Sequence, residues 1–274
     1  MCELFGLSSS FDLKIKYSLH EFAKHGGQIY QNKSGWGIAY HRDKDAILVK
    51  EASPASDSHW VKFIESHPIS TNCAIAHVRY ATAGPPNYAN THPFIRELGG
   101  QRHVFAHNGS LPEIYSKISL KKSNFQPIGQ TDSEYAFCAL LERLTPLWHQ
   151  AKQPPKLEAR LEVISEVAQQ LRSLGPANFL YSDGEILFVH SHRRRWEEKD
   201  GFSEPKPPGL SFISLKVAQL ETMGLQLQDC DTQGIIALVA SVPITKDNWQ
   251  PLSEGMILAL DKGKELARYP AENL

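Results

Sequence analysis

The chain has 274 residues, of which 41% are hydrophobic and 22% charged, and its formal net charge at pH 7 is −1. This composition is typical of a globular protein with a substantial core, and the charge argues against nucleic acid or an anionic membrane as the main partner. No apolar run approaches the roughly 20 residues of a membrane span. The chain does not open with a basic segment followed by an apolar stretch, so we expect a cytoplasmic protein.

Four cysteines are scattered along the chain without a Cys-x-x-Cys pair (Cys2, Cys73, Cys138 and Cys230). This spacing favours free thiols over a disulfide framework or a zinc knuckle. Cys73 and Cys138 lie among apolar neighbours, where we expect inert core residues.

In chain order, the hydrophobic pattern predicts runs of strands with two adjacent helices between them. The predicted strands span residues 2–10, 35–41, 46–52, 73–78, 103–109, 178–192, 234–244 and 256–270, with hairpin turns at Asp183-Gly184 and Lys262-Gly263. The predicted helices span residues 13–25, 131–144 and 157–174. The charged, Pro- and Gly-rich segment 193–210 predicts an exposed loop. Strands in runs differ from the regular alternation of a doubly wound sheet, and without a linker we predict one domain over residues 1–274.

The opening "MCELFGL" places Cys2 directly behind the initiator methionine. Cysteine is small enough to permit removal of Met1, after which Cys2 would carry a thiol and a free α-amine. An amine with a pKa near ~8 beside a thiol with a pKa near ~8.5 is a base next to a nucleophile. The alternative is that a cysteine at position 2 is an accident.

Two charged residues lie at the ends of predicted elements. Arg79 ends a buried-type strand in "HVRYATAG", where a guanidinium can bind a carboxylate through two parallel hydrogen bonds or form a structural ion pair. Asp132 begins a helix within "TDSE", a position where carboxylates commonly stabilise the helix terminus. Thr131 followed by Glu134 also fits a capping box.

The tripeptide "HNG" at 107–109 follows another predicted strand. The side-chain amide of Asn108 and the backbone N–H of Gly109 could supply two donors to one developing oxyanion. Asn-Gly is also the commonest tight-turn dipeptide, so a simple turn is the alternative.

Each of these features is common by itself, but the ordered set of MC, HxRYAT, HNG and TDSE is specific. It resembles the class II glutamine amidotransferases, whose glutaminase domain belongs to the N-terminal-nucleophile hydrolases. The motifs cover residues 2 to about 144, and the order of strands extends the resemblance more loosely to the C-terminus.

The resemblance implies a role for each matching residue. Cys2 is similar to the N-terminal nucleophile, with its own α-amine as the general base. Arg79, helped by Thr82, corresponds to the clamp on the α-carboxylate of glutamine, and Asp132 to the partner of its α-ammonium. Asn108 and Gly109 correspond to the oxyanion hole.

The resemblance also implies an α+β fold, a four-layer αββα sandwich of two mostly antiparallel sheets, and no cofactor. The spacing in "GWGIAYH" is similar to the stand-alone branch of the family, which carries no synthase domain. The implied partners are glutamine or a γ-glutamyl amide, and a separate synthase subunit that would receive ammonia. Neither nucleic acid nor a membrane is implied.

Some residues depart from the family pattern or stay outside it. Several synthase-linked members carry a histidine where this chain has Ala83, whereas His92 in "THPF" matches a family histidine near the pocket. A packing or capping role suits His92 equally well. The pair His190 and His192 lacks a nearby Asp, Glu or Cys in sequence, so we expect no metal site. Residues 193–195 are three arginines, which could attract an anion or belong to a solvated loop.

We therefore predict an enzyme that hydrolyses the side-chain amide of glutamine through a thioester at Cys2, giving glutamate and ammonia. A γ-glutamyl conjugate of a small metabolite is the alternative substrate. The bile-salt and penicillin V acylases also begin Met-Cys but lack the other motifs. A non-catalytic amino-acid-binding regulator is the remaining alternative, and it would be expected to have lost Cys2, Asn108 or Asp132, all of which are present.

Overall fold

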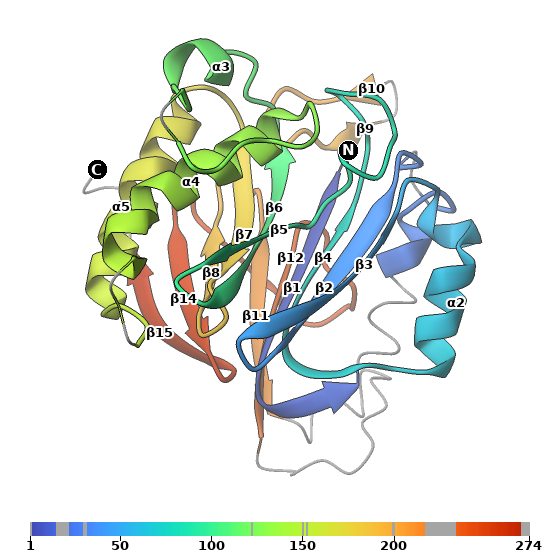
Figure 1. Ribbon diagram of the computed structural model, residues 1–274. Coiled ribbons are helices and arrows are strands. Elements are labelled where there is room, and N and C mark those ends of the chain that lie inside the picture. Colours follow the sequence, from blue (N-terminus) through green and yellow to red (C-terminus); the bar gives the residue numbers. More distant parts are fainter. Residues whose placement is uncertain are drawn as a thin grey trace.

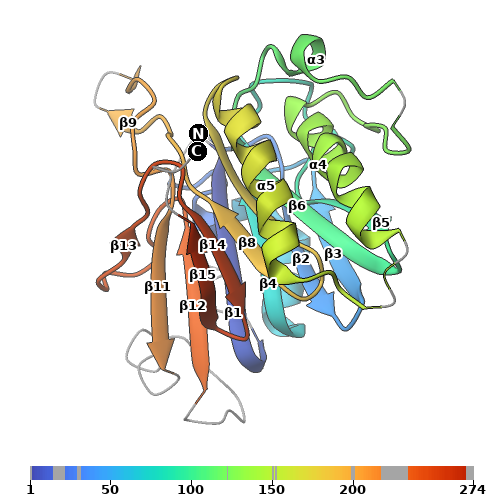
Figure 2. The same ribbon diagram turned by 90° about the vertical axis from the view of Figure 1, so that its left-hand side faces the viewer.

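The computed structural model describes residues 2–14, 22–29, 32–121, 123–149, 151, 153–198, 201–216 and 234–269. Two β-sheets lie face to face at the centre, and helices cover the outer face of each (Figures 1 and 2). Within these ranges, no helix is both long and apolar enough to cross a membrane.

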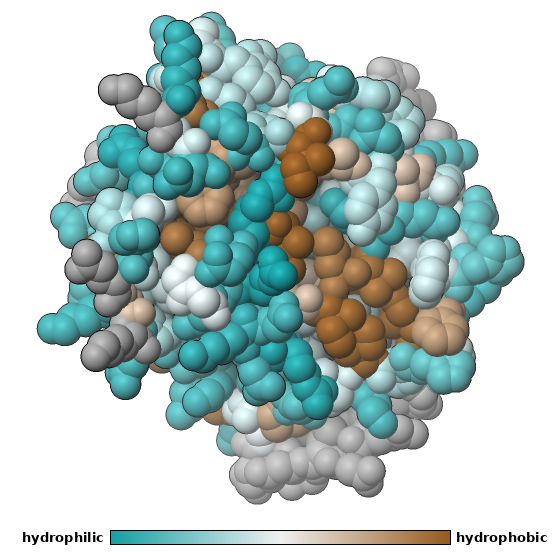
Figure 3. Space-filling view, in the orientation of Figure 1, coloured by the Kyte–Doolittle hydropathy of each residue, from teal (hydrophilic) through white to brown (hydrophobic). Residues whose placement is uncertain are grey.

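The first sheet has seven strands in the order β13-β11-β12-β1-β4-β2-β3. Its strands are β1 (Glu3–Lys14), β2 (Trp36–Arg42), β3 (Asp45–Glu51), β4 (Ser70–Val78), β11 (Ser211–Lys216), β12 (Ile235–Ala240) and β13 (Gln250–Pro251). All neighbouring strands pair antiparallel. β3 is an edge strand that leaves Ile47 44% exposed, and Figure 3 shows an apolar area of the surface over this edge.

The second sheet has six strands in the order β15-β14-β8-β7-β6-β5, again antiparallel throughout. Its strands are β5 (Phe94–Leu98), β6 (Gln101–Gly109), β7 (Ala177–Ser182), β8 (Leu187–His190), β14 (Ile257–Asp261) and β15 (Lys264–Tyr269). All six residues of β7 are buried. Phe179, Leu180 and Tyr181 form its apolar centre, as expected of a strand that is covered on both faces.

The helices are α2 (His59–Ser66), α3 (Ile114–Lys117), α4 (Asp132–Trp148) and α5 (Leu157–Arg172), with a 3₁₀ turn η1 at Ala55–Asp57. Helices α4 and α5 pack on the six-stranded sheet, and α2 lies on the outer side of the seven-stranded sheet (Figure 1). The predicted four-layer αββα arrangement of two antiparallel sheets is thereby confirmed.

Three clusters of buried apolar side chains lie between the four layers of secondary structure. Side chains alternate along a strand, so neighbouring residues of one strand belong to different clusters. Leu4, Val104 and Leu180 pack between the sheets. Their neighbours Phe105 and Phe179 face α4 and α5, and Phe5 faces the layer that contains α2.

Helix α4 begins as its sequence predicts. The Thr131 hydroxyl oxygen accepts the Glu134 N–H at 3.2 Å, which is one half of a capping box. The Glu134 carboxylate does not reach back to Thr131. It accepts instead from the Gly129 N–H at 2.7 Å and from the Arg96 guanidinium.

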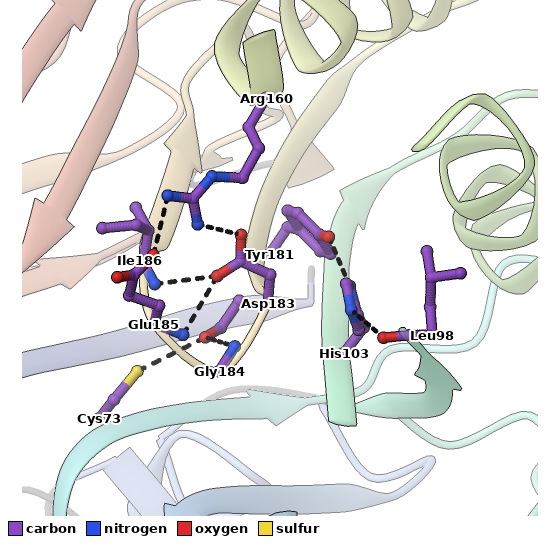
Figure 4. A network of polar contacts seen from close by, with 10 residues as sticks. Cys73, Leu98, His103, Arg160, Tyr181, Asp183, Gly184, Glu185 and Ile186 are labelled. Carbon is purple, nitrogen blue, oxygen red and sulfur yellow. Dashed lines mark hydrogen bonds and ion pairs between the residues drawn. The ribbon is translucent and has the colours of Figure 1, made fainter. Parts of the chain in front are cut away.

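The turn between β7 and β8 is fixed by a buried ionic network (Figure 4). Arg160 of α5 donates to Asp183 and to Glu185, each at 2.8 Å, and Asp183 also accepts the backbone N–H groups of Glu185 and Ile186. Gly184 has φ +94°, which suits glycine and confirms the predicted turn. Val104 pairs with Ser182, whereas Asn108 pairs with Asn178 at the other end of β7.

The structure differs from the sequence prediction at several places. β1 continues through Leu13 and Lys14, where a helix was predicted to begin. Residues 15–21 of the predicted helix 13–25 lie outside the described residues, and residues 22–24 are helical as predicted. Strands β5, β11 and β13 and helices α2 and α3 were not predicted. The expected loop 193–210 contains a small hairpin formed by β9 (Glu197–Glu198) and β10 (Gly201–Phe202).

Candidate active site

Strand register brings the motif residues to one edge of the sandwich. Glu3 pairs with Val78, so Cys2 just before β1 lies opposite the chain that leaves β4. Asn108 is near the end of β6. Val104 and Ala106 of the same strand pack together with Leu4 of the facing sheet. In Figure 1 the N-terminus, the end of β6 and the β9–β10 hairpin lie at the same upper end of the molecule.

The Cys2 thiol lies against the backbone of Tyr80. Its sulfur accepts the Tyr80 N–H at 3.1 Å, and the thiol donates to the Tyr80 carbonyl oxygen at 3.2 Å. Burial raises the pKa of the Cys2 thiol, while the hydrogen bond with Tyr80 and the positive charge of Arg79 lower it and the negative charge of Asp132 raises it. The charges of Arg79 and Asp132 therefore act on the pKa of Cys2 in opposite directions.

Asn108 is bound directly to the residue that carries the thiol. Its side-chain amide donates to the Cys2 carbonyl oxygen at 2.6 Å and to the Ser241 hydroxyl oxygen at 3.4 Å. Ser241 in turn accepts the Leu4 N–H at 3.0 Å. This chain of bonds fixes the start of β1 against the end of β6.

Asn108 and Gly109 are strand residues, so the tight-turn interpretation of "HNG" is wrong. They pair with Asn178 and Ala177 of β7, and this pairing extends the strand past the point where local propensity favours a turn. A Cβ at Gly109 would lie 1.8 Å from the Pro176 carbonyl oxygen, so close backbone approach explains the glycine.

Arg79 is 2% exposed and organises the chain that follows it. Its guanidinium donates to the carbonyl oxygens of Ala83 at 2.8 Å, Gly84 at 3.0 Å and Pro85 at 3.1 Å. A guanidinium has five N–H donors, and three of them serve this loop. Thr82, directly before the loop, is exposed.

Asp132 joins the start of α4 to the loop after β6. One carboxylate oxygen accepts the Leu111 N–H at 2.6 Å, and the other accepts the Ser133 N–H at 2.8 Å. The N-cap of α4 is Thr131, so Asp132 does more than complete the helix terminus. It holds the segment that continues from Asn108 and Gly109.

Three buried histidines lie close to these residues. The rings of His77 and His92 are 4.2 Å apart, and no described residue hydrogen-bonds to the ring nitrogens of either. Burial lowers the pKa of His77 to about 3 and lowers the pKa values of His92 and His107. All three are therefore neutral near pH 7, and His92 packs against His77 and Phe94.

A cavity of about 370 Å³ adjoins Asn108 and Gly109. It is lined by Thr82, Asn108, Gly109, Ser110, Pro112, Leu174, Gly175, Pro176, Pro205 and the arginines 193–195. The interpretation of these arginines as a solvated loop is wrong for Arg194, whereas Arg193 and Arg195 are exposed. Arg194 is only 4% exposed and donates to the Ser241 carbonyl oxygen at 2.6 Å.

The motif analysis missed three residues that hold this edge together: Tyr80, Asn178 and Ser241. Asn178 donates to the carbonyl oxygens of Asn108 at 3.0 Å and Arg193 at 2.7 Å, and accepts the His192 N–H at 2.7 Å. Asn178 in "ANFLYS" and Ser241 in "ALVASVP" are polar residues at the ends of apolar strands, and this pattern is the sequence signal for them.

The family model for class II glutamine amidotransferases matches residues 1–273. The Escherichia coli K12 protein "Putative glutamine amidotransferase YafJ" is 31% identical over 257 residues, which cover 93% of this chain and 95% of that protein.

Solved structures show the same fold. A crystal structure of a predicted glutamine amidotransferase from Pseudomonas aeruginosa aligns with a TM-score of 0.69 at 26% identity, over 97% of this chain and all of that one. The glutamine phosphoribosylpyrophosphate amidotransferase of B. subtilis aligns with a TM-score of 0.60 at 17% identity, over 98% of this chain and 49% of that one. The second likeness concerns the fold alone.

Proposed function

Because this chain belongs to the class II glutamine amidotransferases, we propose that it hydrolyses the side-chain amide of glutamine through a thioester at Cys2. The observation that carries the proposal is the position of Cys2, whose carbonyl oxygen accepts the Asn108 amide at 2.6 Å and whose thiol lies within the fields of Arg79 and Asp132. A nucleophile, an amide donor and one fixed charge of each sign are the parts that this chemistry needs.

The reaction starts from the protein that has lost Met1. The α-amine of Cys2 takes the thiol proton, and the thiolate adds to the side-chain carbonyl carbon of glutamine. The C–N bond then breaks, the proton passes to the departing nitrogen, and ammonia leaves. Water adds to the thioester, so that glutamate is released and the Cys2 thiol is restored.

The oxyanion is assigned to the Asn108 side chain and the Gly109 N–H. Asn108 donates to the Cys2 carbonyl oxygen and to Ser241 without substrate. One of these amide N–H groups must therefore turn to the oxyanion as it forms. The bond to Ser241, at 3.4 Å, is the weaker of the two and is the one we expect to be exchanged.

Glutamine is a zwitterion at its α-carbon, and its recognition needs one cation and one anion. Two guanidinium N–H donors of Arg79 remain beyond the three that serve residues 83–85, and together with Thr82 they are assigned to the α-carboxylate. The carboxylate of Asp132 is assigned to the α-ammonium group.

Two outcomes for the released nitrogen are compatible with this chemistry. In the first, ammonia passes to a separate synthase subunit. A γ-glutamyl amide with a larger leaving group is the second candidate substrate, and the cavity of about 370 Å³ beside Asn108 and Gly109 favours it.

The test is steady-state release of glutamate by the purified, Met1-free protein, with glutamine and asparagine as the matched pair of substrates. We expect release of glutamate from glutamine, no aspartate from asparagine, and no release by Cys2→Ala at an unchanged melting temperature. Turnover by Cys2→Ala equal to that of the wild type would contradict the proposal. A stable protein that binds glutamine without turnover would favour the regulator alternative.

A further inference from the structure

The cavity beside Asn108 and Gly109 has features that hydrolysis of glutamine alone does not use. We infer that it is a subsite for the leaving group of a γ-glutamyl amide, and that Arg195 selects leaving groups that carry a carboxylate. This inference rests on the proposed function, because it takes the scissile carbonyl to lie at Asn108 and Gly109.

The size of the cavity is the first argument. Thr82, assigned to the α-carboxylate, also lines the cavity, so the γ-glutamyl group occupies part of its 370 Å³. A water molecule in the liquid occupies about 30 Å³, and ammonia is similar in size, so ammonia alone would fill little of the part that extends from Asn108 and Gly109 to the arginines 193–195. The walls are formed largely by backbone and apolar groups, such as Pro112, Leu174 and Pro176. A leaving group of several heavy atoms fits this space.

The charge of the cavity is the second argument. Three arginines line it, and no described acidic residue does. Arg193 is paired with Glu254 at 2.8 Å, and the buried Arg194 donates to the Ser241 carbonyl oxygen and stacks on Trp196. Arg195 is exposed and forms no ion pair with any residue that the structure describes. A carboxylate on the leaving group would supply that partner.

The position of the arginines is fixed relative to the oxyanion residues, which is the third argument. The buried side chain of Asn178 donates both to the Asn108 and to the Arg193 carbonyl oxygen. On the other side, Arg194 pairs backbone to backbone with Lys206, which closes the hairpin that ends in β9 and β10. Arg195 is therefore carried by a segment anchored at both ends.

With γ-glutamylglycine as the substrate, the reaction has two steps, acyl transfer to Cys2 and hydrolysis of the thioester. The γ-glutamyl acyl group moves from the glycine nitrogen to Cys2 Sγ, and the thiol proton passes to that nitrogen. Glycine leaves with its carboxylate intact. Water then cleaves the thioester to glutamate and the free thiol.

The test compares kcat/KM for γ-glutamylglycine and for the neutral isostere γ-glutamylglycinamide. The wild type should favour the carboxylate by about tenfold, since hydrogen bonds to a charged group are stronger than neutral ones. Arg195→Gln should bring this ratio close to one, and Arg195→Lys should restore part of it. Arg143→Gln is the matched control, because Arg143 is exposed on α4 and lines none of the described cavities.

The outcomes separate this inference from the proposed function. If the wild type releases glutamate from glutamine but treats the two dipeptide substrates alike, the subsite is wrong and the hydrolase stands. If Arg195→Gln keeps the wild-type ratio, or Arg143→Gln lowers it equally, the assignment of Arg195 is overturned. If no glutamate is released from glutamine or from either dipeptide substrate, the proposed function itself fails.

Discussion

The side-chain amide of Asn108 donates to the backbone carbonyl oxygen of Cys2 across 2.6 Å, although the two residues are 106 positions apart in the sequence. This bond connects the two sheets at the edge where the motifs gather. It places the proposed oxyanion donor next to the proposed nucleophile, and it makes Asn108 the residue whose role can be tested most sharply against a structural alternative.

We expect Asn108→Ala and Asn108→Asp to lower kcat by about 10²–10³, because removal of one oxyanion donor costs roughly 3–4 kcal/mol in the transition state. In Asn108→Asp, an acceptor would face the developing negative charge. Both kinetic constants and the melting temperature should be measured. Ser241→Ala is the control, because it removes the second acceptor of Asn108 without removing a proposed donor. If Asn108→Ala matched Ser241→Ala, with lower stability but intact turnover, Asn108 would be structural only.

The two halves of the zwitterion can be tested with truncated substrates. The compound 4-aminobutanamide lacks the α-carboxylate of glutamine, and glutaramate lacks the α-ammonium. Arg79→Lys loses the planar fork and should reduce the preference for glutamine over 4-aminobutanamide more than tenfold. Asp132→Asn should reduce the preference over glutaramate in the same way.

These two substitutions also serve as controls for each other. If Arg79→Lys lowers the melting temperature but keeps the preference for glutamine, Arg79 acts only through its bonds to residues 83–85. An equal loss of kcat/KM for all three substrates would likewise contradict the assignment.

We expect that breaking the ionic network at the β7–β8 turn lowers stability without lowering catalysis. Arg160→Met leaves Asp183, which is 0% exposed, as an uncompensated buried charge, and this should cost about 3–5 kcal/mol. The Km for glutamine should not change, because the turn lies at the far end of β7 from Asn178. Arg102→Met is the control, since its pair with Asp45 is exposed and should contribute about 0–1 kcal/mol. Equal effects in chemical denaturation would contradict the buried-charge explanation.

Because His41 is buried, we expect the free energy of unfolding to fall as the pH falls. Burial lowers the pKa of His41 to about 4, against the opposing charges of Asp183 and Asp45. The unfolded chain therefore takes up a proton near pH 6.5 that the folded chain does not, so the stabilisation is present above pH 6.5 and is lost as the pH falls towards 4. The slope is about 1.4 kcal/mol per pH unit in this window.

His41→Phe should remove the share of this dependence that His41 contributes. No described residue hydrogen-bonds to the ring nitrogens of His41, so the substitution should reduce the loss of unfolding free energy between pH 7 and pH 5 by about 2 kcal/mol. His59→Phe, at an exposed position on α2, should leave the loss unchanged. Denaturant titrations at both pH values measure it, and a wild-type pH dependence in His41→Phe would refute the buried-histidine account.

The parts of the fold that were predicted correctly are those with a strong local signal. The apolar run before Arg79 is β4, Thr131 caps α4, and Asp183-Gly184 forms its turn. Local signals were weaker elsewhere: β5 is five residues with two charges, and β11 follows a Pro-rich segment that suggested only a loop.

Long-range contacts explain why the remaining features could not be predicted from the sequence. The dipeptide Asn108-Gly109 has turn propensity, but β7 extends it as a strand, and the partner that decides this is about 70 positions away. The motifs indicated a common site for Cys2 and Asn108, which a hydrogen bond joins in the structure. They could not predict that Ser241 would join Leu4 and Asn108, because nothing local to "ASVP" indicates its partners.

The central claim is that Cys2 is the nucleophile, and alkylation by the glutamine analogue 6-diazo-5-oxo-norleucine tests it most directly. Burial raises the pKa of Cys73 to about 12 and that of Cys138 to about 11. Neither thiol carries the α-amine that is proposed to take the proton of Cys2, so neither should compete. We predict complete inactivation with one adduct per chain, located at Cys2 of the Met1-free protein by peptide mapping and prevented by glutamine. Inactivation with the adduct at Cys73 or Cys138, or full activity of a chain that retains Met1, would contradict the account.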